Sequence, residues 1–262
     1  MSTPTVNDLP PATRPGANAW AQMILAEMRM VIRDTAGLIL PIGMPSLLMI
    51  MMGQGSANEA VDDLDGMTVL EWYLVPSTLV MVMTLVGVVN MPSFLAAYRK
   101  YGVLRRLGVT PAHPLMILVA QVITSVIQTA IGIGLALVLA DVVFGLQGPR
   151  ELVMTIAMVV LVAAAMYAVG MFIAAVSPTA NAAIAFGLVG FFAFGATGGM
   201  FGPTENLPTS VQQIGELLPY GAGMQAIQDA WTGMGVEGTH LLALGVAIVV
   251  SVAGSAIWFR WD

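Results

Sequence analysis

A cluster of four basic residues is the part of this sequence whose chemistry points most directly to a contact with another molecule. Arg99, Lys100, Arg105 and Arg106 lie in one short connection between two long apolar stretches. In a protein that crosses a membrane repeatedly, cationic loops stay on the cytoplasmic side. The cluster therefore predicts the orientation of the chain and marks a surface that a cytoplasmic partner could grip.

Helical spacing extends this cluster into an amphipathic pattern over residues 94–107. One face carries Phe94, Ala97, Tyr98, Tyr101 and Leu104, and the other carries Arg99, Lys100 and Arg106. Such a pattern predicts a helix along the membrane surface with its cationic face toward the cytoplasm. Arg105 falls among the apolar positions, where a guanidinium needs a carboxylate or carbonyl partner. The alternative is a charged loop that only sets the topology.

Catalytic chemistry has little support in the sequence. The chain contains no cysteine, which excludes disulfides, thiol catalysis and cysteine-based metal sites. No phosphate-binding loop and no H-E-x-x-H or G-x-S-x-G motif occurs. We therefore predict no catalytic residue, no bound cofactor and no metal site in this chain, so that any energy source must lie in another polypeptide.

The composition indicates a membrane protein. Hydrophobic residues make up 58% of the 262 residues and charged residues only 9%, whereas about a quarter of a typical soluble domain is charged. We predict an all-α polytopic fold with six transmembrane helices, at 37–52, 69–91, 115–144, 152–176, 182–201 and 241–259. Pro41 and Pro45 predict a kinked or tilted first span.

The distribution of cations predicts the topology. With both termini in the cytoplasm, the inside segments carry Arg14, Arg29, Arg33, Arg99, Lys100, Arg105, Arg106 and Arg260, and only Arg150 lies outside. The localisation expected is a bacterial cytoplasmic membrane. Glu71 and Asp141 fall near the outer ends of spans, where we expect them to reach the lipid headgroups.

The segments before the first span divide into a tail and a helix. Residues 1–19 read as a disordered cytoplasmic tail, and residues 20–262 as a single transmembrane domain. Residues 20–34 have the spacing of an interfacial helix, with Trp20 on the apolar side and Arg29 and Arg33 on the polar side. Glu27 falls on the apolar side, so we expect it to have a partner such as Arg29 or another helix end.

The region before the last span and the polar face of the third span can each be interpreted in two ways. Residues 211–218 and 223–231 show short apolar helical patterns that favour a re-entrant helical hairpin before the last span, the alternative being an exposed loop. Gln121, Ser125 and Gln128 share one face of the third span. They could line a transport path or form hydrogen bonds that pack neighbouring helices.

Several short motifs, in order, resemble the ABC-2 permeases, the membrane subunits of type 2 ABC exporters. They are the lead-in ending Arg33-Asp34, the run from Gly102 to Leu107 followed by Thr110-Pro111, Ser177-Pro178, Gly199-Met200-Phe201 with Pro203, Leu207-Pro208, and Leu218-Pro219-Tyr220. Tyr101 stands where family members often have Glu, which removes any ion pair made by that residue.

The resemblance implies a permease that pairs with a second copy and with a separate ABC ATPase, which uses ATP and Mg. The helix over 94–107 would couple to the ATPase and residues 20–34 would form the connecting helix. The cargo expected is an amphipathic or hydrophobic small molecule, such as a drug or antibiotic. One alternative is export of lipid or polysaccharide. The other is a secondary transporter, which fits less well because the sequence shows neither internal repeats nor buried charges. Membrane lipid is an expected partner, and nucleic acid is not.

Overall fold

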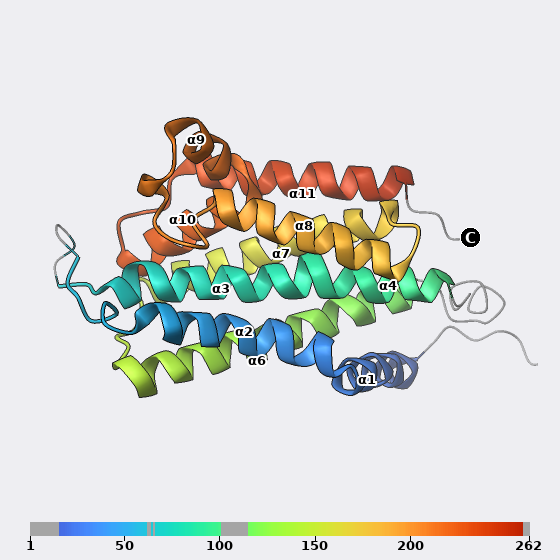
Figure 1. Cartoon of the computed structure of the whole chain (residues 1–262). Helices are drawn as coiled ribbons and strands as arrows, with labels where there is room; N and C mark the ends of the chain where they lie inside the picture. Colours follow the sequence, from blue (N-terminus) through green and yellow to red (C-terminus); the bar gives the residue numbers. More distant parts are fainter. Residues whose placement is uncertain (1–15, 62–63, 65, 101–114, 259–262) are drawn as a thin grey trace, which may run out of the picture.

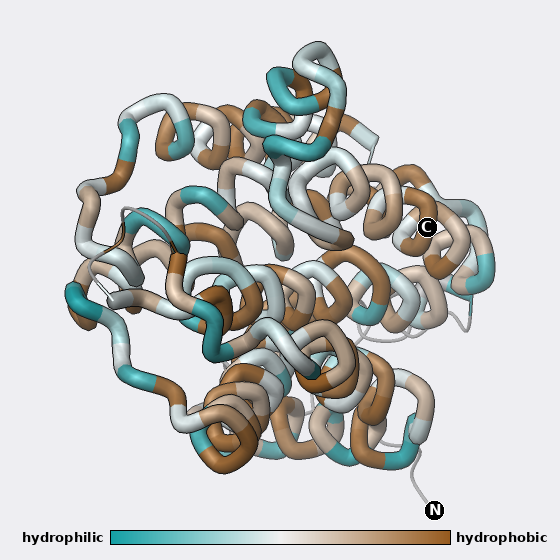
Figure 2. The backbone as a smooth tube through the Cα atoms, turned by 60° about the vertical axis from the view of Figure 1, so that its left-hand side comes forward, coloured by the Kyte–Doolittle hydropathy of each residue, from teal (hydrophilic) through white to brown (hydrophobic). Residues whose placement is uncertain are grey.

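Helices make up the framework of the protein. The computed structural model describes residues 16–61, 64, 66–100 and 115–258. Six helical segments of this part are long and apolar enough to cross a membrane, as predicted, and they run as Thr35–Gly53, Leu70–Tyr98, Met116–Phe144, Leu152–Val176, Ala180–Thr197 and Gly238–Trp258. Figure 2 shows hydrophobic residues along these helices. The chain is therefore a multi-pass membrane protein.

The spanning helices lie side by side with short helices at the two ends of the bundle (Figure 1). The spans consist of α2 (Thr35–Gly53), the composite second span, α6 (Leu115–Phe144), α7 (Leu152–Val176), α8 (Ala180–Thr197) and α11 (Gly238–Trp258). At one end lies α1 (Ala17–Arg33), and at the other lie η4 (Thr204–Asn206), α9 (Thr209–Leu217) and α10 (Pro219–Thr232). We call these the α1 end and the α9 end.

The second span is the central helix of the bundle. It is built from η2 (Leu70–Leu74), α3 (Val75–Thr84), η3 (Leu85–Asn90) and α4 (Met91–Lys100), and η2 and η3 are π-helical. In its most apolar window 89% of the residues are buried, against 22–44% in the other spans. It contacts α2, α6, α7, α8 and α10. The outer faces of the other spans expose large apolar side chains such as Leu47, Val153 and Val189, as lipid contact requires.

The predicted spans match the observed helices, with two informative differences at their ends. The fifth span stops at Thr197 rather than 201, because Gly198 caps the helix and Gly199 has a positive φ of 88°. The second span does not stop at 91. Phe94 to Lys100 continue it as α4, since Phe94, Leu95 and Tyr98 are buried against other helices. The remainder of the predicted surface helix, residues 101–107, lies outside the described residues.

Two short helices occur where the sequence predicts a hairpin before the last span. Tyr220 and Ile227 of α10 are fully buried, whereas Ile214 and Leu217 of α9 are exposed. The junction is tight because Gly198, Gly215 and Gly221 bring the backbones of α8, α9 and α10 together. Insertion of this pair into a membrane leaflet stays a prediction.

The closest approach between the central helix and α7 depends on two glycines. A Cβ atom on Gly170 of α7 would overlap the carbonyl oxygen of Gly87 in η3, and one on Gly87 would lie 2.9 Å from the Met166 carbonyl carbon. Both obstacles are backbone atoms, which cannot move aside as a side chain can. Glycine at these positions therefore allows the two helices to pack in direct backbone contact.

We expect Gly170→Ala to lower the stability of the bundle by about 1–3 kcal/mol, the usual range for overpacking in a core. Gly245→Ala in α11 is the matched control, because a Cβ atom there meets nothing within 4 Å. Thermal unfolding of both variants in detergent measures the effect. Equal midpoints for the two variants would contradict the backbone contact.

Candidate functional site

The α1 end contains a hydrogen bond between two buried side chains from distant parts of the sequence. The Tyr98 hydroxyl, near the end of α4, donates to the Glu27 carboxylate of α1 and also lies 3.4 Å from Met30 Sδ. Glu27 and Tyr98 are only 4% and 5% exposed. Burial raises the pKa of Glu27, and the Tyr98 hydrogen bond partly offsets this rise. Of the partners considered for Glu27, another helix end is the one observed.

Several other residues proposed to face an ATPase belong to α1 and α4, the two helices that this bond joins. Arg29 and Arg33 are exposed on α1, Trp20 is half-buried, and Phe94 is buried in α4. Arg99 and Lys100 are the last residues of α4, and Lys100 is exposed. Tyr101, Leu104, Arg105 and Arg106 lie outside the described residues, so their predicted coupling role stays a prediction.

The start of the first span is held by a set of contacts around Gly37, which we call the Gly37 junction. Pro41 has no N–H, so the Gly37 carbonyl lacks the donor that an ordinary residue four positions on would supply. That carbonyl accepts instead from Gln128 Nε2 at 2.6 Å and from Asn90 Nδ2 at 2.9 Å. Asn90 Nδ2 also lies 3.0 Å from Gln128 Oε1. The junction thus joins α2, the central helix and α6.

The Asp34 side chain completes the junction from the α1 side. Its Oδ1 accepts from the Gly37 N–H at 3.1 Å and caps α2. The proline four residues after Gly37 is the sequence signal that could have identified this carbonyl as a hydrogen-bond acceptor. The partners Asn90 and Gln128 could not be paired from the sequence, because they lie on different helices.

The three polar residues of the third span occupy different surroundings. Gln128 belongs to the Gly37 junction. The carbonyl oxygen of Ser125 lies 3.2 Å from the Tyr167 hydroxyl, which bonds Thr129 Oγ1 at 2.7 Å. Gln121 is buried, and its Oε1 has no hydrogen-bond partner among the described residues. All three side chains face the bundle interior, and path lining by them stays a prediction.

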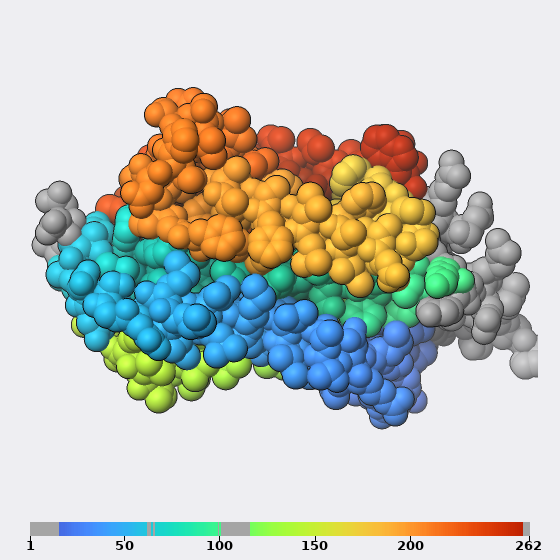
Figure 3. Space-filling model, viewed as in Figure 1, coloured from blue at the N-terminus to red at the C-terminus, as the bar shows by residue number. Residues whose placement is uncertain are grey.

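A groove of about 230 Å³ runs beside the Gly37 junction, between α2 and α8, with the central helix as its floor. In Figure 3 the surface of α3 and α4 is visible between α2 and α8. Most of its walls are apolar, and we call it the α2–α8 groove. It is lined by Asp34, Ala36, Gly37, Leu40, Pro41, Met44, Leu85, Val89, Asn90, Ser93, Ile184, Leu188, Phe191 and Phe192. Its polar side chains, Asp34, Asn90 and Ser93, come from the α1 end.

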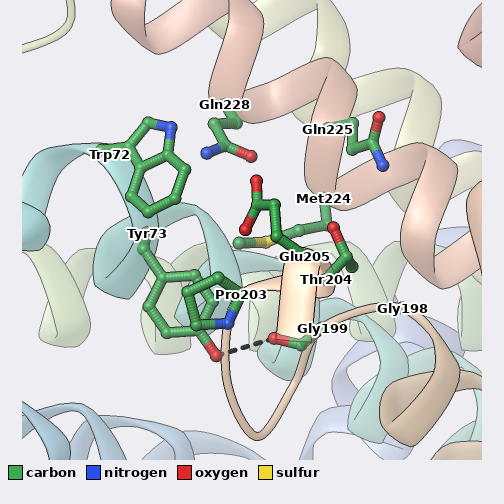
Figure 4. A pocket seen from close by; sticks show the side chains of 10 residues that line it. All are labelled: Trp72, Tyr73, Gly198, Gly199, Pro203, Thr204, Glu205, Met224, Gln225 and Gln228. Atoms are coloured by element: carbon green, nitrogen blue, oxygen red, sulfur yellow. Dashed lines mark hydrogen bonds between the residues drawn. The ribbon is translucent and has the colours of Figure 1, made fainter. Parts of the chain in front are cut away.

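A smaller cavity lies at the α9 end (Figure 4). Its volume of about 20 Å³ suits a single water molecule. Trp72 and Tyr73 of η2 line one side, Met224 of α10 lines another, and Glu205 of η4 points into it. The Tyr73 hydroxyl donates to the Gly199 carbonyl at 2.7 Å, which ties the central helix to the segment after α8.

Of the two acidic residues expected at the headgroups, Asp141 is exposed but Glu71 is not. Glu71 is 4% exposed, and its two carboxylate oxygens accept from the backbone N–H groups of Thr68 and Gln147, each at 3.1 Å. The expectation for Glu71 is therefore wrong. Two backbone donors that the sequence cannot reveal hold this carboxylate inside the protein and join two connections of the α9 end.

The Glu27–Tyr98 bond predicts a difference between two conservative variants. Tyr98→Phe leaves a buried carboxylate without its donor, so we expect a loss of about 1–3 kcal/mol of stability. Glu27→Gln keeps an acceptor for Tyr98 and removes the buried charge, so its stability at pH 7 should equal or exceed that of the wild type.

Because burial raises the pKa of Glu27 in the folded protein, this residue contributes stability at low pH that is lost as the pH rises through that pKa. The defect of Tyr98→Phe should therefore grow between pH 5 and pH 8, whereas Glu27→Gln should not share the dependence. Thermal unfolding in detergent across this range measures both. A Tyr98→Phe defect that is the same at every pH would argue against the bond.

The amino-acid sequence is also similar to a known protein family. The sequence model of a family described as ABC-2 type transporter matches residues 18–231 of this chain. The match takes in α1, the first five spans, α9 and α10. A comparison with curated proteins gives no match. Six spanning helices, the helix α1 before them and a family match over most of the chain lead to one conclusion: this protein belongs to the ABC-2 type transporter family and is a membrane permease component of an ABC transporter.

Proposed function

We propose that the chain is the permease subunit of an ATP-driven exporter of amphipathic or hydrophobic small molecules, such as drugs or antibiotics. The observation that carries this proposal is the α2–α8 groove, an apolar space with a few polar groups at one end. Small-molecule sites commonly combine mostly apolar walls with a small number of polar groups that orient the ligand. The cargo would move along this groove within a pair of permeases.

The charges at the two ends of the bundle support a cytoplasmic α1 end in a bacterial cytoplasmic membrane. Arg29, Arg33 and Lys100 are exposed at the α1 end. Glu205 and Glu237 are exposed at the α9 end, which also carries Arg150. Cationic residues near the ends of spans favour the cytoplasm. Both termini would then be cytoplasmic, and the cargo would leave at the α9 end.

ABC-2 permeases generally work with an ABC ATPase, and the α1 end is the surface we propose for that contact. It carries the exposed cations of α1 and leads into the basic segment that follows α4. ATP and Mg would be used by the ATPase alone. The second permease would be an identical chain, and the exposed apolar faces of the spans would contact lipid.

The groove proposal predicts the effect of filling it. Leu188 of α8 lines the groove and is 39% exposed. Leu188→Trp should narrow the space and reduce export of a hydrophobic compound at least fivefold, measured as accumulation in cells that express the permease and its ATPase. Leu135→Trp in α6 is the matched control, because Leu135 is 38% exposed and does not line this groove. If cells with Leu188→Trp accumulate no more of the compound than cells with the wild type, the cargo does not pass through the groove.

The choice of cargo needs a comparison between classes in the same cells. Drug resistance that requires the permease supports the proposal. Unchanged resistance together with altered lipid or polysaccharide export would replace it with the alternative exporter.

The coupling proposal predicts the effect of reversing charge after α4. Arg105→Glu and Arg106→Glu should weaken association with the ATPase at least tenfold, because the docking surface would repel an acidic partner. The remaining cations should still orient the chain in the membrane. Co-purification of the ATPase with each variant, with Arg14→Glu as the control in the tail, measures this. If co-purification and transport are both unchanged, the basic segment only sets the topology of the chain and does not bind the ATPase.

A further inference from the structure

The α1 end of the α2–α8 groove holds two oxygen acceptors that face the same point. A Cβ atom placed on Gly37 would lie 2.8 Å from Asn90 Oδ1 and 2.8 Å from Asp34 Oδ2. Glycine leaves this position empty of side chain, and both oxygens lie close to it. Both residues line the groove.

Neither oxygen is used by the contacts that build the junction. Asp34 bonds the Gly37 N–H through Oδ1, and Asn90 bonds its neighbours through Nδ2. Asp34 forms no ion pair with another of the described residues. Within the described part of the chain, one carboxylate oxygen and one amide oxygen are therefore available as acceptors at the edge of an apolar groove.

This pair of acceptors selects among the possible cargoes. A carboxylate oxygen and an amide oxygen both require a donor, and the negative charge of Asp34 favours a cation while it repels a carboxylate or phosphate group. The apolar walls next to them, including Leu40, Leu188 and Phe192, accept a hydrocarbon or aromatic body. The complementary molecule carries an ammonium group on an apolar body.

We propose that the α2–α8 groove binds amphipathic amines, with the ammonium group held by Asp34 Oδ2 and Asn90 Oδ1. The proposal rests on the proposed export function and narrows its cargo to one chemical class. Asp34 is a binding residue in this arrangement as well as the cap of α2. A substitution that separates the two roles is available, since asparagine also caps helices but carries no charge.

The test compares two probes that share the same dansyl group and alkyl chain, of which one ends in an ammonium group and the other in an uncharged amide. Full-length permease in phosphatidylcholine nanodiscs is titrated with dansylcadaverine, a primary amine, and with its uncharged N-acetyl derivative, and the signal from protein-free nanodiscs is subtracted. Wild type should bind the amine about tenfold more tightly than the acetylated probe, as one charge-assisted hydrogen bond at a partly solvated site suggests.

Three variants identify the residues on which the preference for the amine probe depends. Asp34→Asn should bring the affinity ratio close to one and leave the affinity for the acetylated probe unchanged. Leu188→Trp should weaken both probes. Glu205→Gln is the matched control, because it removes the carboxylate of the small cavity at the α9 end and should leave the ratio as in wild type. Equal unfolding midpoints for Asp34→Asn and wild type check that the cap survives.

The outcomes distinguish this proposal from the function on which it rests. An unchanged ratio in Asp34→Asn, or a ratio lost in Glu205→Gln, would overturn the amine site. Equal binding of the two probes by wild type would also overturn it, yet would leave export of small molecules in place. Failure of both probes to bind, together with negative resistance assays, would overturn the proposed function itself.

Discussion

In the hydrocarbon of a membrane, a backbone carbonyl without a donor costs several kcal/mol, and the Gly37 carbonyl is one that its own helix cannot satisfy. Pro41 removes the donor, and the amides of Asn90 and Gln128 replace it. This replacement requires the central helix and α6 to lie against the first turns of α2. These two donors join the start of α2 to the central helix and to α6, beside the α2–α8 groove.

The central helix connects the two ends of the molecule. At the α1 end, Tyr98 bonds Glu27 and Asn90 belongs to the Gly37 junction. At the α9 end, Tyr73 bonds the Gly199 carbonyl, and Glu71 holds the connections on either side of it. Between these points Gly87 and Gly170 place the central helix in backbone contact with α7. One helix therefore carries the contacts that position α1, the groove and the short helices of the opposite end.

The polar and the apolar parts of the α2–α8 groove come from different elements. The acceptors Asp34 and Asn90 belong to the Gly37 junction, whereas Leu188 and Phe192 belong to α8, in which few residues are buried. The polar end is thus held by hydrogen bonds, and the apolar wall packs against the central helix. Such a site can fix the orientation of a polar group and accept apolar bodies of different shapes.

The sequence by itself determined the membrane environment, the six spans and the family resemblance. Hydrophobic length and charge bias are properties of continuous segments, so the stretches 115–144 and 152–176 could be placed without knowledge of their neighbours. Helix periodicity also placed Glu27 on the apolar face of α1, which required a partner. Pro41 and Pro45 predicted a kinked or tilted first span, and this stays a prediction, since α2 is one continuous helix over Thr35–Gly53.

Only the tertiary structure decided which residues meet. Tyr98 was the partner of Glu27, the amides of Asn90 and Gln128 were the donors to Gly37, and two loop N–H groups kept Glu71 out of the headgroups. Each of these contacts joins residues from different elements, and their distances depend on helix rotation and crossing that no local pattern encodes. The site of this protein is made of such contacts, which is why the sequence could predict its elements but not its geometry.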